Sequence, residues 1–488
     1  MLNLLRTKKA RIIAVVLILT ISFTAIAASF IVSKQIKEGP YIRVGTHDVS
    51  RIEYEFYKNL YVSTFETQYS DYLEALGIDK TKEYKDQQCL MYEDLTWNEY
   101  FEGRAIDVLQ ETYILEDDIK ETGYEFDTDQ LYSEFIEQTS RNAFESSVSL
   151  DEYLSIHYAE GANKRNFKDV YSRYILIGKY REEKKKNLIP DDATLNKYYT
   201  DNKQKFDLVN FRDFIIGAST TSANGETVSE ETAMNTAKEQ AESMFAKIYN
   251  QETFLDVCAE NGASSRDYYK TSTLYENIDY DNCPPAIVSW LFDEKRENNA
   301  IAVIEDKTNK EYHLVFFINR EKNILPTVNF RNILIKDSIA GATSDEAVTS
   351  AKNKIKEIIE DYEKTNKTEE NFADLAKKYS EDTDSATNGG LYSEILASSI
   401  TQDSAKWLFD SIRTSGDYTT IYAPGSGAYA LYYVGRGDPA WKVSARNEIV
   451  ENSYNEFIDK KRSEYTATDL RGEVDYLKLA TPDQIISK

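Results

Sequence analysis

The residue types that most often carry catalysis or bind metal ions are scarce in this sequence. Its three histidines, His47, His157 and His313, are far apart, and so are its three cysteines. This spacing suggests neither a metal cluster nor a Ser/His/Asp arrangement. An odd number of dispersed cysteines also fits no disulfide framework. We therefore expect no metal ion and no other cofactor.

Charge and motif content argue against two more classes of function. No GxGxxG or GxxxxGK[ST] segment occurs, so a nucleotide cofactor has no support. Lys and Arg number 58 against 83 Asp and Glu, which gives a formal net charge of -25. A nucleic-acid binder needs a basic surface to displace counterions from phosphate, so we expect no nucleic-acid partner. Acidic pairs such as Asp117-Asp118 could bind calcium, but solvated faces or helix starts explain them more simply.

The elements that must position any site begin after an apolar N-terminal run. Residues 12–32 are 21 positions without a charge, and residues 1–11 carry four basic and no acidic side chains. About 20 apolar residues in a helix span the hydrocarbon core of a bilayer, and the basic flank stays in the cytoplasm. A cleaved signal peptide is the alternative, because Ala25-Ile26-Ala27 fits a cleavage site. The run continues beyond Ala27, so we predict an uncleaved transmembrane anchor, with a cytoplasmic tail before it and the main body outside the cell membrane.

The next region, residues 46–206, reads as a helical domain with few glycines. Ser50 followed by Glu53 is typical of a capping box, and Ile52 and Phe56 begin an apolar pattern at helical spacing. Tyrosine is abundant in the chain, with 36 residues. Tyrosines such as Tyr57 and its neighbours are either ordinary core and boundary aromatics or a groove of amphipathic rings that grips varied peptides.

An internal repeat organises the second half of the chain. The segment Val209–Arg212 recurs as Val328–Arg331, and Trp290–Asp293 recurs as Trp407–Asp410. Further anchors recur in the same order, all at offsets between 117 and 119 residues. Each copy, over residues 207–323 and 326–438, predicts a strand, two helices, a short helix and a second strand.

The second copy carries a specific pattern. It contains Arg331-Asn332-Ile333-Leu334, then the segment Phe372–Asp382, then Ser385-Ala386 before Gly389-Gly390. This pattern resembles the parvulin-type (PpiC-type) peptidyl-prolyl isomerase domain. The layout around it resembles extracytoplasmic foldases of the SurA/PrsA kind, which have a helical N-terminal domain, one or two parvulin domains and a returning C-terminal helix.

The resemblance implies an α+β fold class. We expect the transmembrane helix to precede a SurA-like all-α domain over residues 46–206 with its linker helix. Two parvulin-like domains then follow over the two copies of the repeat, each a small antiparallel sheet flanked by helices. Residues 439–488 would form a helix that packs back on the N-terminal domain, followed by a tail.

The resemblance also implies where a site would be. Parvulins resemble one another in carrying two histidines beside an Asp or Cys on the central sheet. The site they form lowers the rotation barrier of the amide before proline, which is about 18–20 kcal/mol without a catalyst. In the second copy the first histidine is replaced by Asn332, the Asp/Cys position matches Asp382, and the second histidine is replaced by Ala430. In the first copy the equivalents of the two histidines are Asp213 and His313.

We therefore expect Asp382 and Asn332 as the candidate catalytic residues of the second copy, and His313 and Asp213 as those of the first. Ala430 cannot form a hydrogen bond with its side chain, so a paired arrangement is incomplete. Asp382 could equally be a solvated turn residue, and His313 a satisfied core histidine.

Three functional hypotheses follow. The leading one is a membrane-anchored extracytoplasmic foldase or chaperone that binds unfolded or proline-containing secreted polypeptides, with isomerase activity weak or lost. The second is an active peptidyl-prolyl isomerase that works through the second copy. The third is a surface interaction protein that uses the repeats as binding modules for one partner.

Overall fold

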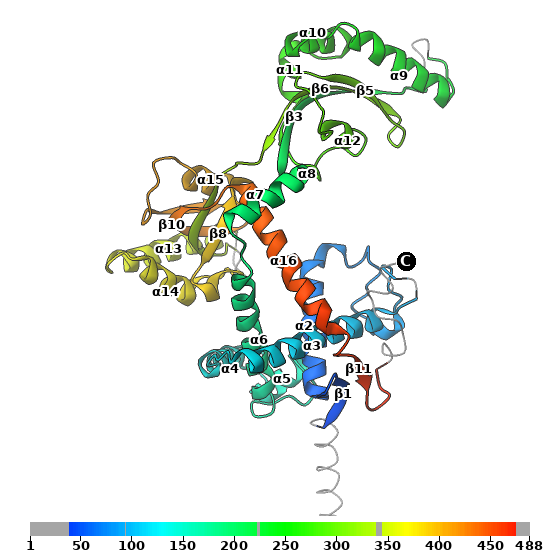
Figure 1. Ribbon diagram of the computed structural model, residues 1–488. Coiled ribbons are helices and arrows are strands. Elements are labelled where there is room, and N and C mark those ends of the chain that lie inside the picture. Colours follow the sequence, from blue (N-terminus) through cyan, green and yellow to red (C-terminus); the bar gives the residue numbers. More distant parts are fainter. Residues whose placement is uncertain (1–38, 93, 222–224, 338–343, 475–488) are drawn as a thin grey trace, which may run out of the picture. The chain divides into compact units, whose positions relative to one another are not determined.

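The computed structural model describes residues 39–474 except 93, 222–224 and 338–343. The chain divides into two compact units, Met1–Ile189 together with Val450–Lys488, and Pro190–Ile449 (Figure 1).

The first unit is built mainly of helices. They are α2 (Arg51–Gln68), α3 (Trp97–Thr122), α4 (Asp129–Glu145), α5 (Leu150–His157) and α6 (Lys168–Asn187), with short 3-10 turns η1 (Ser70–Tyr72) and η2 (Tyr84–Asp86). Local sequence sets the ends of the long helix α3. Thr96 and Glu99 form a reciprocal capping box at its start, and Gly123 ends it in the left-handed conformation, at φ 69°. The apolar faces of these helices pack around buried aromatic side chains such as Phe56 and Phe167.

The predicted fold class was wrong, because the unit that holds the region expected to be all-α also contains a sheet. Strands β1 (Pro40–Val44), β2 (His47–Ser50) and β11 (Ala467–Asp469) form a three-stranded antiparallel sheet in the order β11-β1-β2. The chain is therefore a mixed α/β protein in both units. These strands have three to five residues, too few for a readable alternation of apolar and polar positions, and β11 pairs with β1 across more than 400 residues of sequence.

The expected transmembrane segment, residues 12–32, lies outside the described residues. Among the helices that the structure does describe, none combines the length and the apolar character that a membrane crossing requires.

The second unit contains two sheets with the same topology. After α7 (Asp192–Asp201) and α8 (Lys203–Phe206), the first sheet has the order β4-β3-β6-β5 and the second the order β8-β7-β10-β9, both antiparallel. The elements of the first sheet domain are β3 (Asp207–Gly217), α9 (Glu230–Phe245), α10 (Gln251–Asn261), α11 (Arg266–Ser272), β4 (Leu274–Ile278), α12 (Val288–Leu291), β5 (Ile301–Asp306) and β6 (Glu311–Lys322). Those of the second are β7 (Thr327–Ile335), α13 (Ser344–Glu363), α14 (Glu369–Tyr379), η3 (Ala386–Asn388), β8 (Leu391–Leu396), η4 (Ala397–Ser399), α15 (Gln402–Leu408), β9 (Tyr418–Ala423) and β10 (Gly427–Arg436).

Each sheet has four strands where the sequence pattern predicted two. The missed strands are β4 and β5 in the first sheet and β8 and β9 in the second. They have five or six residues and are the edge strands of the two sheets, and most of their side chains are half-buried on both faces. The alternation that identifies a strand with one buried face is therefore weak in them.

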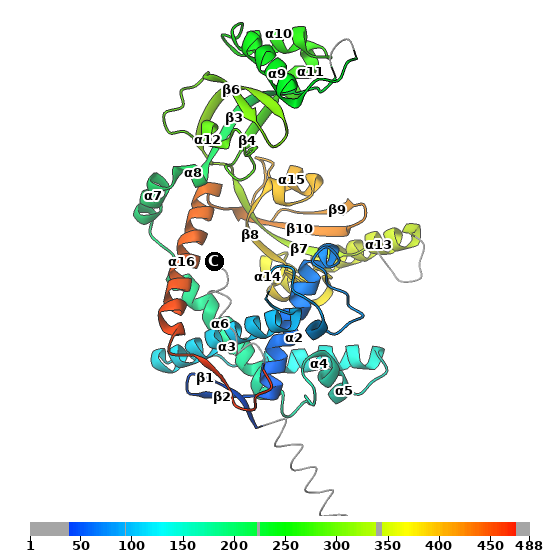
Figure 2. The same cartoon turned by 90° about the vertical axis from the view of Figure 1, so that its right-hand side faces the viewer.

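The two faces of each sheet are covered differently. In the first domain α9 and α10 cover one face, and α12 lies on the other (Figure 1). In the second domain α13 and α14 cover one face, and α15 lies on the other (Figure 2). Since successive side chains of a strand point to opposite faces, the residues that share a face with α12 or α15 follow directly from the strand register.

Helix α16 (Ala440–Arg462) contributes to both units. In the second unit Trp441 and Ala445 pack against the α7–α8 segment. In the first unit Tyr454 and Ile458 pack against apolar side chains of α3 and α6, and Tyr454 donates a hydrogen bond to Glu111.

Candidate functional site

Asp382 lies in the segment that joins α14 to β8, docked against strand β7. This segment follows the end of α14, and Ser380 begins it by accepting a hydrogen bond from the Leu334 backbone at 3.1 Å. Glu381 donates its backbone N–H to the Leu334 carbonyl, and the N–H of Asn332 donates to Gly390. Asp382 is 9% exposed, so it is not a solvated turn residue.

Three side chains donate hydrogen bonds to one oxygen of Asp382. Its Oδ2 accepts from Ser385 Oγ at 2.6 Å, from Tyr392 Oη at 2.8 Å and from Asn332 Nδ2 at 3.0 Å. The other oxygen, Oδ1, accepts from the backbone N–H of Asp384 at 3.2 Å. The structure therefore brings the two candidate residues of the second copy, Asp382 and Asn332, into direct contact.

These bonds fix the charge state of the group. Burial alone would raise the pKa of the Asp382 carboxyl, but the hydrogen bonds from Ser385, Tyr392 and Asn332 outweigh burial and hold that pKa below its usual range. Burial and the bond to Asp382 raise the pKa of Tyr392 to about 12. At neutral pH a carboxylate therefore accepts from a protonated phenol.

Asn332 keeps one unused hydrogen-bonding atom. Its side chain is 5% exposed, and its Oδ1 is buried without a hydrogen-bond partner among the residues that the structure describes. Asn332 lies on the sheet face that α15 covers, as strand alternation requires of a residue two positions from Phe330.

The pairing of the strands places the second expected histidine position one residue earlier in β10, at Tyr429 instead of Ala430. In the first sheet the residue paired with Asp213 lies two positions beyond His313 on β6. In the second sheet the residue paired with Asn332 lies two positions beyond Tyr429 on β10. Tyr429 therefore takes the place of His313, and the prediction of Ala430 was wrong. Ala430 faces the core under α13 and α14, on the opposite side of the sheet.

In the first sheet the two candidate residues form a buried pair. His313 is 2% exposed and Asp213 is 4% exposed, and His313 Nδ1 lies 2.7 Å from Asp213 Oδ2. Burial alone would lower the pKa of His313, but the hydrogen bond to Asp213 and the charges of Glu311 and Asp306 outweigh it and raise that pKa. The other ring nitrogen, Nε2, is buried and has no hydrogen-bond partner among the described residues.

The remaining two histidines take no part in either pair. His47 Nε2 lies 2.7 Å from Asp117 Oδ2, and its ring stacks on Tyr113. His157 stacks on Tyr153 at the end of α5. Both belong to the first unit.

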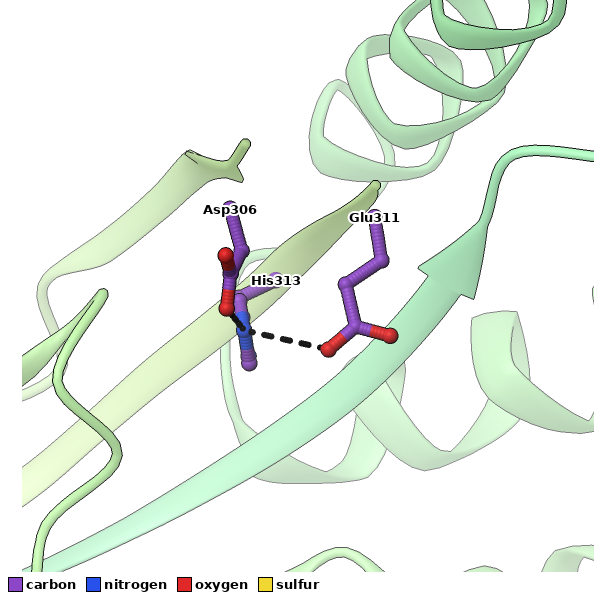
Figure 3. A group of neighbouring side chains, drawn as sticks. All are labelled: Asp306, Glu311 and His313. Carbon is purple, nitrogen blue, oxygen red and sulfur yellow. Dashed lines mark ion pairs between the residues drawn. The ribbon is translucent and has the colours of Figure 1, made fainter. Parts of the chain in front are cut away.

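One group of described residues has the donor atoms for a metal ion, and sequence reasoning missed two of its three members. Asp306, Glu311 and His313 meet at the β5–β6 hairpin (Figure 3). The signal was present: Glu311 and His313 are two residues apart in a strand, and a short turn returns the chain from Asp306.

Two grooves are lined by residues other than these candidates. A groove of 570 Å³ in the second sheet domain lies between α13 and β9, and its apolar lining includes Ile355, Ile359 and Tyr422. Asp382 is not among the residues that line it. A groove of 450 Å³ in the first unit has a floor of aromatic and aliphatic side chains that includes Tyr57, which was one of the tyrosines left open by the sequence. It is lined by residues of α2, α3, α6 and α16: Tyr57, Leu60, Tyr61, Thr64, Val108, Glu111, Thr112, Tyr174, Ile177, Gly178, Arg181, Lys185, Glu451, Tyr454 and Asn455.

The second sheet domain matches a known family. Residues 333–428 match the Rotamase family, described as the PPIC-type PPIASE domain. This segment is a parvulin-type peptidyl-prolyl isomerase (PPIase) domain. The resemblance inferred from the sequence is thereby confirmed for the second copy of the repeat, and domains of this family bind polypeptide substrates. A search of curated proteins gave no match to the chain.

Three solved structures of PrsA proteins match parts of the chain. The peptidylprolyl isomerase PrsA from Bacillus anthracis is 16% identical, with 50% of this chain and 92% of that chain covered and a TM-score of 0.19. PrsA from Bacillus cereus is 12% identical, with coverages of 63% and 83% and a TM-score of 0.19. The foldase protein PrsA from Lactococcus lactis is 12% identical, with coverages of 72% and 97% and a TM-score of 0.19.

Proposed function

We propose that this chain is an extracytoplasmic foldase that binds unfolded or proline-containing polypeptides, with isomerase activity that is weak or lost. The observation that carries the proposal is the state of Asp382. Its Oδ2 accepts from three internal donors, so no free carboxylate faces a substrate. Asn332 and Tyr429 occupy the positions where the resemblance implies histidines, so the imidazole pair is missing.

An active isomerase is the second candidate, and one atom favours it. Isomerisation needs groups that bind the twisted prolyl amide better than the planar one. The unpartnered Asn332 Oδ1 lies beside Asp382 and could accept a hydrogen bond that forms only in the twisted state.

Exchange spectroscopy by NMR separates these two candidates. A purified chain that starts at residue 39 would be added to a short Xaa-Pro peptide, and the cis/trans exchange rate compared with that of the peptide alone. We expect no acceleration from a sample whose own spectrum shows it folded. Acceleration that Asp382→Ala abolishes would instead establish an active isomerase with a remodelled site.

The groove of the first unit supports polypeptide binding. Tyr174, which is 38% exposed, and Leu60 offer apolar surface, while Arg181 and Glu111 pair at 2.8 Å in the groove lining. Amphipathic rings with a polar edge suit clients of varied sequence, since they bury area without requiring one particular partner.

Gly178 allows this groove to be filled without damage to the fold. It lies in α6, and a Cβ added there would meet no atom within 4 Å. Gly178→Gln should project into the groove and stabilise the helix by up to about 1 kcal/mol, since glycine is a poor helix former. We expect this variant to suppress the aggregation of an unfolded client less well than the unchanged chain.

Gly217→Gln is the matched control, because a Cβ at Gly217 also meets open space but lies at the end of β3, outside this groove. If both variants lost client binding to the same extent, or if neither lost it, a client site in the groove would be contradicted. Binding of only one defined partner, and no general client, would favour the surface interaction protein.

The location outside the cytoplasm and the attachment to a membrane belong to this proposal. They are supported by the uncharged run over residues 12–32 and the basic residues before it. Attachment would raise the effective concentration of the binding surfaces near polypeptides that emerge from the membrane.

A further inference from the structure

Three polar side chains meet on one face of the β5–β6 hairpin, outside the PPIase domain. In the register of this hairpin Asp306 is paired with Glu311, and His313 is two residues further along β6. Because side chains two residues apart in a strand share a face, Glu311 and His313 lie side by side, with Asp306 across from Glu311. Figure 3 shows the two carboxylates on either side of the His313 ring.

His313 presents an unpaired nitrogen to these carboxylates. The Asp213 carboxylate can only accept, so His313 Nδ1 carries the proton of the 2.7 Å hydrogen bond between them. Nε2 lies 3.8 Å from Asp306 Oδ2 and 3.7 Å from Glu311 Oε1. Both distances are too long for hydrogen bonds, so this buried nitrogen is directed between two carboxylates without bonding to either.

The carboxylates are held in place and lack a Lys or Arg partner. Oδ1 of Asp306 accepts from the backbone N–H groups of Thr308 and Asn309, which close the hairpin turn and orient the carboxylate. Within the described part of the chain, His313 is the only ion-pair partner of Asp306 and of Glu311. Two buried or half-buried carboxylates beside one imidazole leave an excess of negative charge that a cation would neutralise.

We propose that Asp306, Glu311 and His313 bind a divalent transition-metal ion such as Zn²⁺, with Asp213 as a positioning residue. Imidazole nitrogen and carboxylate oxygen are common ligands of Zn²⁺. The ligand atoms lie within 4.8 Å of one another, and Zn²⁺ bonds of about 2.0–2.2 Å require separations of about 3.3 Å in a tetrahedral site. Glu311 is partly exposed, so a small rotation of its side chain closes the gap and leaves a fourth position for water.

Asp213 completes the arrangement from the neighbouring strand β3. Histidines that bind metal ions usually donate their second N–H to a carboxylate or carbonyl, which fixes the tautomer and orients the ring. The hydrogen bond from Nδ1 to Asp213 does this for His313 and leaves the lone pair of Nε2 directed at the ion. The ion would link strands β5 and β6 beside the hairpin turn. The site is independent of the proposed foldase function.

A proton is the competitor that the test must separate from a metal ion. A doubly protonated His313 would also neutralise the surrounding carboxylates, and it would bind no metal. Zinc titration of the purified full chain after treatment with a chelator, followed by calorimetry, distinguishes the two. We expect one saturable Zn²⁺ per chain.

Two variants and a control assign the ion to this site. Glu311→Gln removes a ligand from a partly exposed position, so it should fold and bind Zn²⁺ at least about tenfold more weakly, and Asp213→Asn should weaken binding by about 10–100-fold. Glu305→Gln removes one negative charge from an exposed side chain on the same hairpin but on the opposite face, and it should bind as the unchanged chain does.

Imidazole nitrogen NMR gives a second readout, and its spectrum is simple because the chain has only three histidines. Zn²⁺ should shift the Nε2 resonance of His313 and leave those of His47 and His157 unchanged. Absence of stoichiometric binding would overturn the proposal. Binding that Glu311→Gln and Asp213→Asn leave intact, or that shifts another histidine, would place the ion elsewhere and overturn it equally.

Discussion

At the scale of single residues, the carboxylate of Asp382 is an internal hydrogen-bond acceptor of the PPIase domain. Asp382 is buried, and the donors on its Oδ2 come from β7, β8 and the segment between α14 and β8. Hydrogen bonds to a charged group contribute about 1.5–3 kcal/mol each, more than those between neutral groups. The carboxylate thus holds together parts of the chain that are distant in sequence, and this role does not require a substrate.

Asp382→Asn should therefore destabilise the chain in a pH-dependent way. At neutral pH the amide would turn an N–H toward donors, so we expect a loss of about 2–4 kcal/mol in the free energy of unfolding. The folded-state pKa of Asp382 lies below 3.8, so its contribution is present above that value and is lost as the pH falls through the folded pKa. Urea unfolding at a series of pH values measures the difference between the two chains.

The difference should stay constant from pH 8 to pH 5 and shrink only below pH 3.8. Asp384→Asn is the control, because Asp384 lies in the same turn but its side chain is exposed. A difference that has already vanished at pH 5 would contradict the assignment of a carboxylate with a lowered pKa.

At the scale of elements, two glycines allow the segment after η3 to approach β7. Gly389 and Gly390 both have positive φ, 65° and 73°. A Cβ at Gly390 would lie 2.2 Å from the Asn332 carbonyl oxygen, which belongs to the backbone and cannot move without shifting the strand. Glycine is therefore needed here for close approach as well as for backbone conformation.

Gly390→Ala should cost about 3 kcal/mol or more, the sum of a left-handed conformation at about 1–2 kcal/mol and a backbone clash. Gly425→Ala is the matched control, because Gly425 also has positive φ, 78°, but a Cβ there meets no atom within 4 Å. Thermal unfolding of both variants measures the difference. Equal losses of stability would show that close packing against Asn332 contributes nothing.

The elements also show which features could be predicted from sequence. Local signals located helix starts: Ser50 accepts from the Glu53 N–H at the start of α2, which is one half of the predicted capping box. The Glu53 side chain instead accepts from Tyr113 and Arg173. The resemblance placed Asp382 beside Asn332, because both belong to the segments that match the parvulin pattern. Features that depend on pairing were missed: β11 joins β1 from the other end of the chain, and the register that puts Tyr429 in place of His313 differs by one residue from the alignment of the repeats.

The hairpin cluster was missed for the same reason. Asp306, Glu311 and His313 are close in sequence, but their meeting depends on a four-residue turn that pairs Asp306 with Glu311. The spacing of the histidines alone does not reveal a site in which carboxylates supply two of the three ligands.

At the scale of the whole molecule, the C-terminal segment completes the first unit. The second half of α16 and strand β11 belong to the same compact unit as residues 39–189. The buried apolar side chains of residues 450–474 are Val450, Tyr454, Ile458 and Val474. At about 1.5–3 kcal/mol each, these side chains contribute about 6–12 kcal/mol to the first unit, an upper estimate that is comparable to the whole stability of a typical domain, about 5–15 kcal/mol.

A fragment of residues 39–189 should therefore not fold alone. It would expose the apolar surface of α3 and α6 that Tyr454 and Ile458 cover, and it would leave β1 without its partner β11. We expect no cooperative urea transition from the fragment, and recovery of one when a peptide of residues 440–474 is added. The same peptide with Tyr454→Asp and Ile458→Asp should not restore it. A cooperative transition in the fragment alone would mean that the chain does not need its C-terminal segment to build this unit. The segment would then supply the α16 side of the groove lining without being required for the fold of the unit.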